Sequence, residues 1–441
     1  MVTSPERFSP PLYNLSSRMT FSPLPWHALL LVLLVGTHAF FAYLAVRNLR
    51  HSRSMLEAER DWLASRLGLD EPKEVFGYTA IKTGFGQLQS WIGLAFLLLV
   101  LYAGVFTEIV VYLDATGLHP LIAGVIFFVG FVVALQLFSV PFDLIDTFVV
   151  EELYEFNNQT LGLWIRDAIL GMAVTVILTV FLVGALLLFV MALPTWWWLA
   201  TALFFIGFSL VMQVVYPRAI APIFNDFEPI EDGSLREAVE GVFNRAGFTC
   251  DELYLMDASR RSSHVNAYFV GFGRTKRVVL FDTLVEQLEE AEIQSVLAHE
   301  LAHWKRHHIW KQLGGSTIRV TITLFVLWVL IDTPAIYEMF NIPETAVYAG
   351  LFIGLLFVGP LLRWTAPLEN RLSLAHEREA DRFAVTVLDT EEPMVSALET
   401  LASENLSNPF PDPLYATFHY SHPPIPERIR SIREAANAVT G

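Results

Sequence analysis

The sequence predicts a mainly α-helical protein that crosses a membrane several times and carries a soluble α+β insert. Of its 441 residues, 54% are hydrophobic and only 17% are charged, and the mean hydropathy is positive. Apolar stretches of about 20 residues, long enough to span about 30 Å of hydrocarbon as helices, recur along the chain. These two observations exclude an ordinary soluble globular protein.

Seven apolar stretches meet the length requirement, and we expect a transmembrane helix at each of them. They are residues 26–46, 91–113, 121–140, 168–193, 196–216, 317–336 and 346–362. The first is longer than a signal-peptide core and has no small-residue cleavage site after it, so we interpret it as a retained anchor. The alternative, in which one stretch is only a buried or re-entrant helix, would separate the two soluble segments that hold the polar motifs.

The spans divide the chain into five parts. A leader (1–25) precedes the first five spans (26–217), a soluble insert (218–312) follows them, and two spans (313–364) lead to a soluble C-terminal segment (365–441).

A basic cluster sets the expected orientation. Arg47, Arg50, His51 and Arg53 follow the first stretch, and such clusters remain on the cytosolic side. Seven crossings then place the leader outside and both soluble segments in the cytosol. The expected location is the cell membrane in a prokaryote or the endoplasmic reticulum membrane in a eukaryote.

Cysteine content and net charge limit the ligands and partners. Cys250 is the only cysteine, so an internal disulfide and a thiolate metal cage are both excluded, and any metal must bind histidines and carboxylates. The net charge of −16 argues against a nucleic-acid partner, because phosphate binding requires a basic face.

The soluble insert has mixed secondary-structure signals. We expect a helix at 234–246, strands at 253–256, 265–269 and 277–281 with a hairpin at Gly271 and Gly273, and amphipathic helices at 283–290 and 292–308.

The last of these helices contains the sequence His299-Glu300-Leu301-Ala302-His303. Residues four apart share a helix face, so both histidines can bind one zinc ion, with Glu300 placed as general base. A helix that merely bears surface histidines is the alternative. His307 lies near the same face, but the glycine and spacing of the longer three-histidine motif are missing, so we interpret it as interfacial.

A second polar helix, expected at residues 370–381, is rich in candidate ligands. Glu377 is our third metal ligand, and Asp381, one turn later, can accept the free ring N–H of a metal-bound histidine. An ordinary helix salt bridge is the competing interpretation of Asp381. Glu379 falls on another face and is interpreted as a solvated charge.

Near the C-terminus, His422 precedes Pro423 and Pro424. A histidine on this rigid backbone could donate a hydrogen bond to the oxyanion of a tetrahedral intermediate. A turn histidine without a catalytic role fits the spacing as well.

At this point the chain resembles a known family, the integral-membrane type I CAAX prenyl endopeptidases, which are zinc metalloproteases with the HExxH motif. The matching segments cover most of the chain beyond the second span, in order: residues 150–163, 216–225, 266–269, 276–283, 299–303, 370–381 and 420–424. Two positions depart from the family pattern. Leu374 stands where arginine is common, and Glu155 stands where glycine is common.

The resemblance implies seven helices that enclose a polar chamber, with a cytosolic zincin-like catalytic insert. It implies one Zn²⁺ per chain on His299, His303 and Glu377, and it favours a catalytic role for His422. It also implies that the strand of Asn266, Ala267 and Tyr268 binds the substrate backbone as an added strand.

The predicted function is a zinc-dependent membrane endopeptidase that removes the C-terminal tripeptide of prenylated CAAX proteins or related peptides. Its partners would be a peptide or protein substrate and the lipid bilayer. One alternative is a general quality-control metalloprotease for membrane proteins. An alternative of another class is a transporter or lipid-binding scaffold without catalysis, against which the absence of repeated halves and the large insert both speak.

Overall fold

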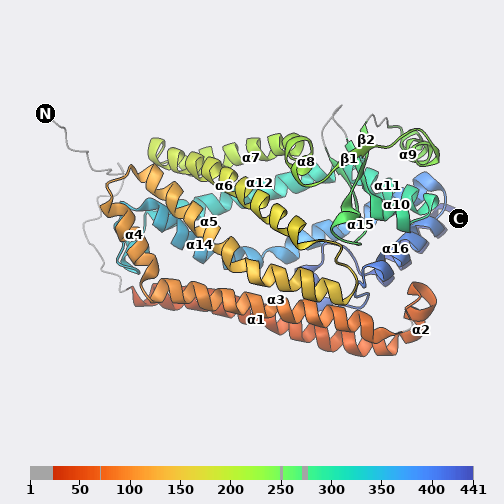
Figure 1. Cartoon of the computed structure of the whole chain (residues 1–441), viewed down its shortest axis with the longest axis horizontal. Coiled ribbons are helices and arrows are strands. Elements are labelled where there is room, and N and C mark those ends of the chain that lie inside the picture. The colour runs from red at the N-terminus through yellow and green to blue at the C-terminus, as the bar shows by residue number, and fades with distance from the viewer. Residues whose placement is uncertain (1–22, 70, 249–251, 271–276, 441) are drawn as a thin grey trace.

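The computed structural model describes residues 23–69, 71–248, 252–270 and 277–440. Most of the predicted leader, Cys250, and the predicted hairpin glycines Gly271 and Gly273 lie outside the described residues. Long helices run along one axis of the molecule, and the α+β part lies at one end of them (Figure 1).

The long apolar helices agree with the expectation of a polytopic membrane protein. Six segments of the described chain are long and apolar enough to cross a membrane. Four are single helices: α1 (Leu24–Ala58), α3 (Pro72–Tyr102), α6 (Leu161–Ala192) and α12 (His308–Ile331). The other two are composite: α5 (Pro120–Ile145) continued by η2 (Asp146–Glu151), and α7 (Trp197–Val215) continued by η3 (Tyr216–Ile220) and α8 (Ala221–Phe224). A seventh span results if α14 (Val347–Arg363) and α15 (Ala366–Leu388), bent by 47°, are counted together. We treat α14 as the membrane helix of this pair, because α15 carries many charged side chains.

The predicted second span, residues 91–113, has the wrong limits. The helix begins much earlier, at Pro72, and ends at Tyr102, where Gly104 adopts a left-handed φ of 86° and separates off α4 (Val105–Ala115). Hydropathy missed the first half of α3 because that half is polar. Lys82 of this half binds Asp146 at 2.8 Å and Glu151 at 2.7 Å, so its charge is satisfied by the end of α5.

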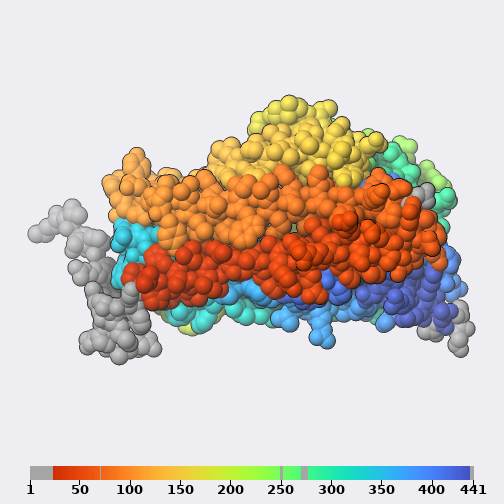
Figure 2. Space-filling view, turned by 90° about the horizontal axis from the view of Figure 1, so that it is seen from below, coloured from red at the N-terminus to blue at the C-terminus, as the bar shows by residue number. Residues whose placement is uncertain are grey.

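Buried side chains are unevenly distributed in the helical bundle. At the end remote from the sheet, aromatic residues from α4, α5, α7 and α14 pack into one cluster, including Phe106, Phe127, Trp197 and Phe352. Burial differs between the helices of the bundle: α1 has buried side chains along its length from Leu30 to Leu56, whereas Leu187 is the only buried side chain in all of α6. This pattern agrees with helices that enclose a chamber instead of packing around a solid core. Figure 2 shows α1 and α3 lying side by side along the length of the molecule.

The α+β part is built on a four-stranded sheet with the order β1-β2-β4-β3. Its strands are β1 (Phe227–Pro229), β2 (Glu252–Met256), β3 (Ala267–Val270) and β4 (Arg277–Phe281). Strands β2 and β4 are parallel, and the β1–β2 and β3–β4 pairs are antiparallel. The three predicted strands are confirmed within two residues, and β3 is an outer strand whose far edge pairs with no other described strand.

Helices cover the sheet and connect it to the membrane part. They are α9 (Ser234–Arg245), α10 (Asp282–Gln287), α11 (Glu290–Lys305), α16 (Glu392–Glu404), α17 (Pro413–His419) and α18 (Ile425–Thr440). Short elements complete the fold: α2 (Arg60–Trp62), η1 (Leu63–Leu67), η4 (Ala258–Arg260) and α13 (Pro334–Glu338). The predicted helices 234–246, 283–290 and 292–308 correspond to α9, α10 and α11.

Candidate active site

Helix α11 is fixed at its start by a capping box and along its length by the sheet. The Glu289 side chain accepts from the N3 backbone, and Glu292 reaches back to the backbone N–H of Glu289 at 2.9 Å. Ile293, Leu297 and Leu301, spaced four apart, are buried in the core that includes the sheet. This packing directs His299 and His303 toward α15.

Three side chains from α11 and α15 converge on one point. His299 Nε2 lies 3.1 Å from His303 Nε2, and the two carboxylate oxygens of Glu377 lie 3.4 Å from His299 Nε2 and 3.3 Å from His303 Nε2. Glu377 is buried, and its Oε2 makes no hydrogen bond. These three residues are a group that could hold a metal ion.

Asp381 and Arg428 lie directly behind His299. Asp381 Oδ1 is 2.8 Å from His299 Nδ1, and the Arg428 guanidinium donates to Asp381 Oδ2 at 3.1 Å and to Oδ1 at 2.5 Å. Burial acts to raise the pKa of Asp381, but Arg428 and His299 outweigh it and hold the pKa at about 2. Asp381 is therefore a carboxylate that fixes the imidazole of His299.

The electrostatics of the group favour a cation. Burial acts to lower the pKa of His299, but Asp381 and Glu377 outweigh it and raise the pKa to about 9. In turn, His299 and His303 hold the pKa of Glu377 well below its usual range, against the effect of burial. Asp381 and Glu377 thus stabilise the positively charged form of His299.

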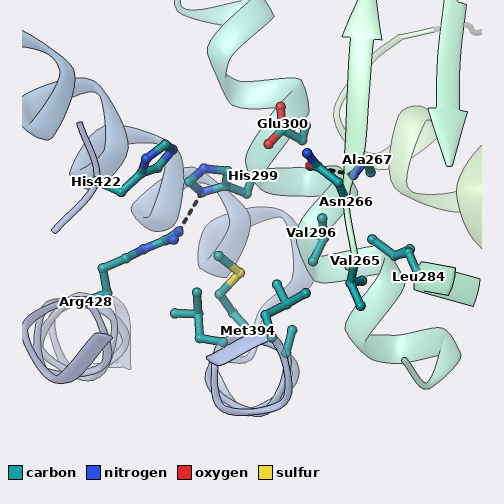
Figure 3. A pocket seen from close by; sticks show the side chains of 13 residues that line it. Val265, Asn266, Ala267, Leu284, Val296, His299, Glu300, Met394, His422 and Arg428 are labelled. Atoms are coloured by element: carbon teal, nitrogen blue, oxygen red, sulfur yellow. Dashed lines mark hydrogen bonds between the residues drawn. The ribbon is translucent and has the colours of Figure 1, made fainter. Parts of the chain in front are cut away.

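A pocket beside the three residues connects them to the sheet edge (Figure 3). Its polar side contains Asn266, His299, Glu300, His422 and Arg428, and helix α16 supplies an apolar wall of Met394, Ala397, Leu398 and Leu401. In Figure 3, Glu300 and Asn266 lie on one side of His299, and His422 lies on the other.

The three residues of the predicted substrate strand face different directions. Asn266 and Ala267 line the pocket. The ring of Tyr268 instead packs edge-on against Phe281 in the cluster on the other face of the sheet. Because the Phe281 N–H donates to the Asn266 carbonyl directly opposite it, the backbone N–H and C=O of Tyr268, two residues on, also face β4. The backbone groups of Ala267 instead lie at the outer edge of β3, where an extended peptide could pair with them.

His422 reaches the site from the segment between α17 and α18. Its Nε2 lies 3.5 Å from Glu377 Oε1, and its Nδ1 lies 3.0 Å from Ser421 Oγ. With 61% of its side chain exposed, the ring is accessible to a peptide in the pocket.

Two residues near the site were missed by the sequence analysis, and a third was misjudged. Arg428 lies on amphipathic α18, where no local pattern distinguishes it from other surface arginines. His308 is buried against His303, while the neighbouring His307 is exposed. The interpretation of Glu379 as a merely solvated charge is wrong, because it hydrogen-bonds His308 at 3.1 Å.

Family models match nearly the whole described chain. Peptidase family M48 matches residues 229–436, and a model described as the CAAX prenyl protease N-terminal region, five membrane helices, matches residues 61–226. The boundary between the two lies at the start of the sheet.

Curated and solved proteins agree with these models. A CAAX prenyl protease 1 homolog of Arabidopsis thaliana is 40% identical over 69% of this chain and 72% of its own length. CAAX prenyl protease 1 of Saccharomyces cerevisiae is 32% identical over 69% of this chain and 71% of its own length. The crystal structure of S. mikatae Ste24p superposes with a TM-score of 0.84 at 27% identity, covering 92% of this chain and 99% of that one.

The geometry predicts that Glu377→Ala abolishes metal binding. The substitution removes both oxygens that face the two histidines, and two imidazoles alone leave the metal without a protein carboxylate. Elemental analysis of the purified protein should show metal falling from about one per chain to a small fraction. Glu369→Ala, on the same helix, is the control and should retain its metal; full metal in Glu377→Ala would contradict the ligand assignment.

Proposed function

The chain belongs to the CAAX prenyl protease 1 family of M48 peptidases and is a membrane metalloendopeptidase, and from this premise we propose its metal, mechanism and substrate. The proposed metal is one zinc ion per chain, held by His299, His303 and Glu377. The proposed reaction is removal of the C-terminal tripeptide from prenylated CAAX proteins or related peptides.

The spacing of the three ligands supports zinc. Ligand atoms 2.0–2.1 Å from a tetrahedral zinc lie roughly 3.3 Å from each other. The two histidine Nε2 atoms are 3.1 Å apart, and each has a different oxygen of Glu377 within 3.3 or 3.4 Å. The buried Glu377 Oε2 without a hydrogen bond is the atom that such an ion would satisfy. Two histidines and one glutamate leave the fourth position free, as catalytic zinc sites require.

Two side chains of the pocket, Glu300 and His422, have roles in the proposed mechanism beside the metal. A zinc ion bound here supplies Lewis acidity toward water and the scissile carbonyl. Glu300, in the pocket beside His299, accepts a proton from the attacking water and returns it to the leaving amine. His422, on the opposite side of His299, donates a hydrogen bond to the oxyanion.

The outer strand β3 supports recognition of an extended peptide. Its free edge can pair with a substrate backbone, which holds any sequence in register with the metal. The apolar wall formed by Met394 and Leu398 suits an aliphatic side chain next to the cleaved bond. The sparse burial of α6 supports a chamber with room for a lipid chain.

The role of Glu300 predicts that Glu300→Gln reduces peptide cleavage by about 10²–10⁴-fold, the usual contribution of a general base. Because glutamine is isosteric and Glu300 is not a ligand, zinc content should remain near one per chain. Cleavage assays and elemental analysis on the same sample test both parts. Loss of zinc from this variant, or full activity, would contradict the assigned role.

The proposed substrate predicts faster cleavage of a farnesylated CAAX peptide than of the same peptide without the lipid. Burial of the prenyl chain should appear mainly as a lower KM, at about 0.8 kcal/mol for each buried CH₂ group. Equal kcat/KM for both peptides would instead favour the second candidate, a general quality-control protease. If the zinc-loaded protein cleaves neither peptide, the proposed class of substrate is refuted.

We also propose that the site faces the cytosol. Arg47 of the basic cluster pairs with Asp412 of the C-terminal segment at 2.8 Å, so the cluster and the site share one end of the molecule (Figure 1). Basic clusters beside spans stay cytosolic.

This orientation predicts the outcome of cysteine labelling in a Cys250→Ser background. In sealed vesicles with the cytosolic face outward, an impermeant maleimide should label Glu434→Cys, on exposed α18. Thr116→Cys, exposed after α4 at the remote end, should react only after permeabilisation. The reverse pattern would show that the site faces away from the cytosol.

A further inference from the structure

We propose that His308 and Glu379 position the metal ligand His303 through a chain of hydrogen bonds from Glu379 to His308 to His303. The proposal deepens the proposed function and rests on it, because it assumes a metal at His303. It assigns a role to a buried histidine and a surface carboxylate that the hydrolytic mechanism does not use.

The atoms are arranged as a relay. His303 Nε2 faces the metal site, 3.3 Å from Glu377 Oε1. The other ring nitrogen, Nδ1, lies 3.1 Å from His308 Nδ1, and His308 Nε2 lies 3.1 Å from Glu379 Oε2. One imidazole therefore connects the ligand to a carboxylate on another helix.

The proton positions of the relay are mutually consistent. A nitrogen that binds a metal has no proton, so His303 carries its proton on Nδ1 and donates it to His308 Nδ1. His308 Nδ1 can accept only if its own proton is on Nε2, and that N–H faces the Glu379 carboxylate. Glu379 thus fixes the tautomer of His308, and His308 fixes the tautomer of His303 that binds a metal through Nε2.

A break between two helices creates this contact. In a continuous helix, residues five apart point about 140° away from each other, so His303 and His308 could not meet. Helix α11 ends at Lys305, His307 adopts a left-handed φ of 58°, and α12 begins at His308. The turn folds the ring of His308 back onto α11.

The ring of His308 is held on several sides. Only 1% of the residue is exposed, and the ring of His376 stacks on it at 4.0 Å and 14°. Glu379 is itself held in place, because its second oxygen lies 3.3 Å from Arg306 Nε. Such rigid support is what a group that orients a ligand requires.

The two metal-binding histidines therefore have different outer partners. His299 is backed by Asp381, whose side chain is 1% exposed, whereas the relay of His303 ends at Glu379, whose side chain is 40% exposed. The outer end of the relay can thus be changed at the surface without opening the core, which makes it testable.

The experiment compares Glu379→Ala with Glu369→Ala in the purified full-length protein. Glu369 is a matched control because it lies on the same helix, pairs with Arg319 and has a 48% exposed side chain. Zinc affinity is measured by competition with a chromophoric chelator, and thermal unfolding is measured on the metal-free proteins. Glu379→Ala should bind zinc about 10–100-fold more weakly, and Glu369→Ala should match the wild type.

A merely structural role would give a different pattern. If the carboxylate only braced the helix, Glu379→Ala would lower the unfolding temperature of the metal-free protein, whereas we expect no change. Glu379→Gln keeps an oxygen acceptor for His308 and should recover most of the affinity.

Three outcomes would overturn the proposal. Equal zinc affinity in Glu379→Ala and Glu369→Ala would show that the relay has no effect on the ligand. A weaker affinity that tracks a less stable metal-free protein would show a structural role only. A wild-type protein that binds no zinc would refute the proposed function itself, and this inference with it.

Discussion

The structure depends on one buried ion pair, between Asp381 and Arg428. Both residues are almost fully buried, beside the buried His299 and Glu377, and a charge in such a place is stable only when it is paired and hydrogen-bonded. Removing one partner of a buried pair costs about 3–5 kcal/mol. Because Asp381, Arg428 and His299 come from α15, α18 and α11, this requirement fixes three helices relative to each other, and the proposed metal ligands with them.

The path of the chain through the membrane also brings α11 and α15 together. Helix α11 carries His299 and α15 carries Asp381, and the chain between them runs out along α12 and back along α14. An out-and-back pair returns the chain to the side it left, so the two halves of the site can meet. The left-handed turn at His307 lies next to the proposed metal ligands and begins the outward path along α12. Where the returning helix α14 ends, α15 follows at a bend of 47°.

The sequence predicted the parts of the site that depend on local spacing. His299, Glu300 and His303 share a helix, and Glu377 and Asp381 lie one turn apart, so helical periodicity was sufficient to group them. His308 was not predicted because its contact with His303 depends on a helix break, and Arg428 was not predicted because only tertiary packing separates it from other arginines on α18. The limits of α3 were missed for a related reason: ion pairs with a distant helix stabilise its polar half.

The membrane part also positions β3, the proposed substrate strand. The backbone N–H of Ser263 donates to the Phe156 carbonyl at 3.3 Å, and that of Asn158 donates to the Arg261 carbonyl at 3.1 Å. The segment that leads into β3 is thereby attached to the end of the α5–η2 span. Glu155, at this junction, has a left-handed φ of 59°, a conformation that glycine adopts without steric cost.

This attachment has a mechanical consequence. The position of β3 is set by the α5–η2 span of the bundle. A peptide paired with β3, and any lipid attached to that peptide, would therefore be positioned relative to this span. In the proposed function, the helical bundle is therefore part of the substrate site, and a soluble domain cut away from it would lose the register between the strand and the proposed metal site.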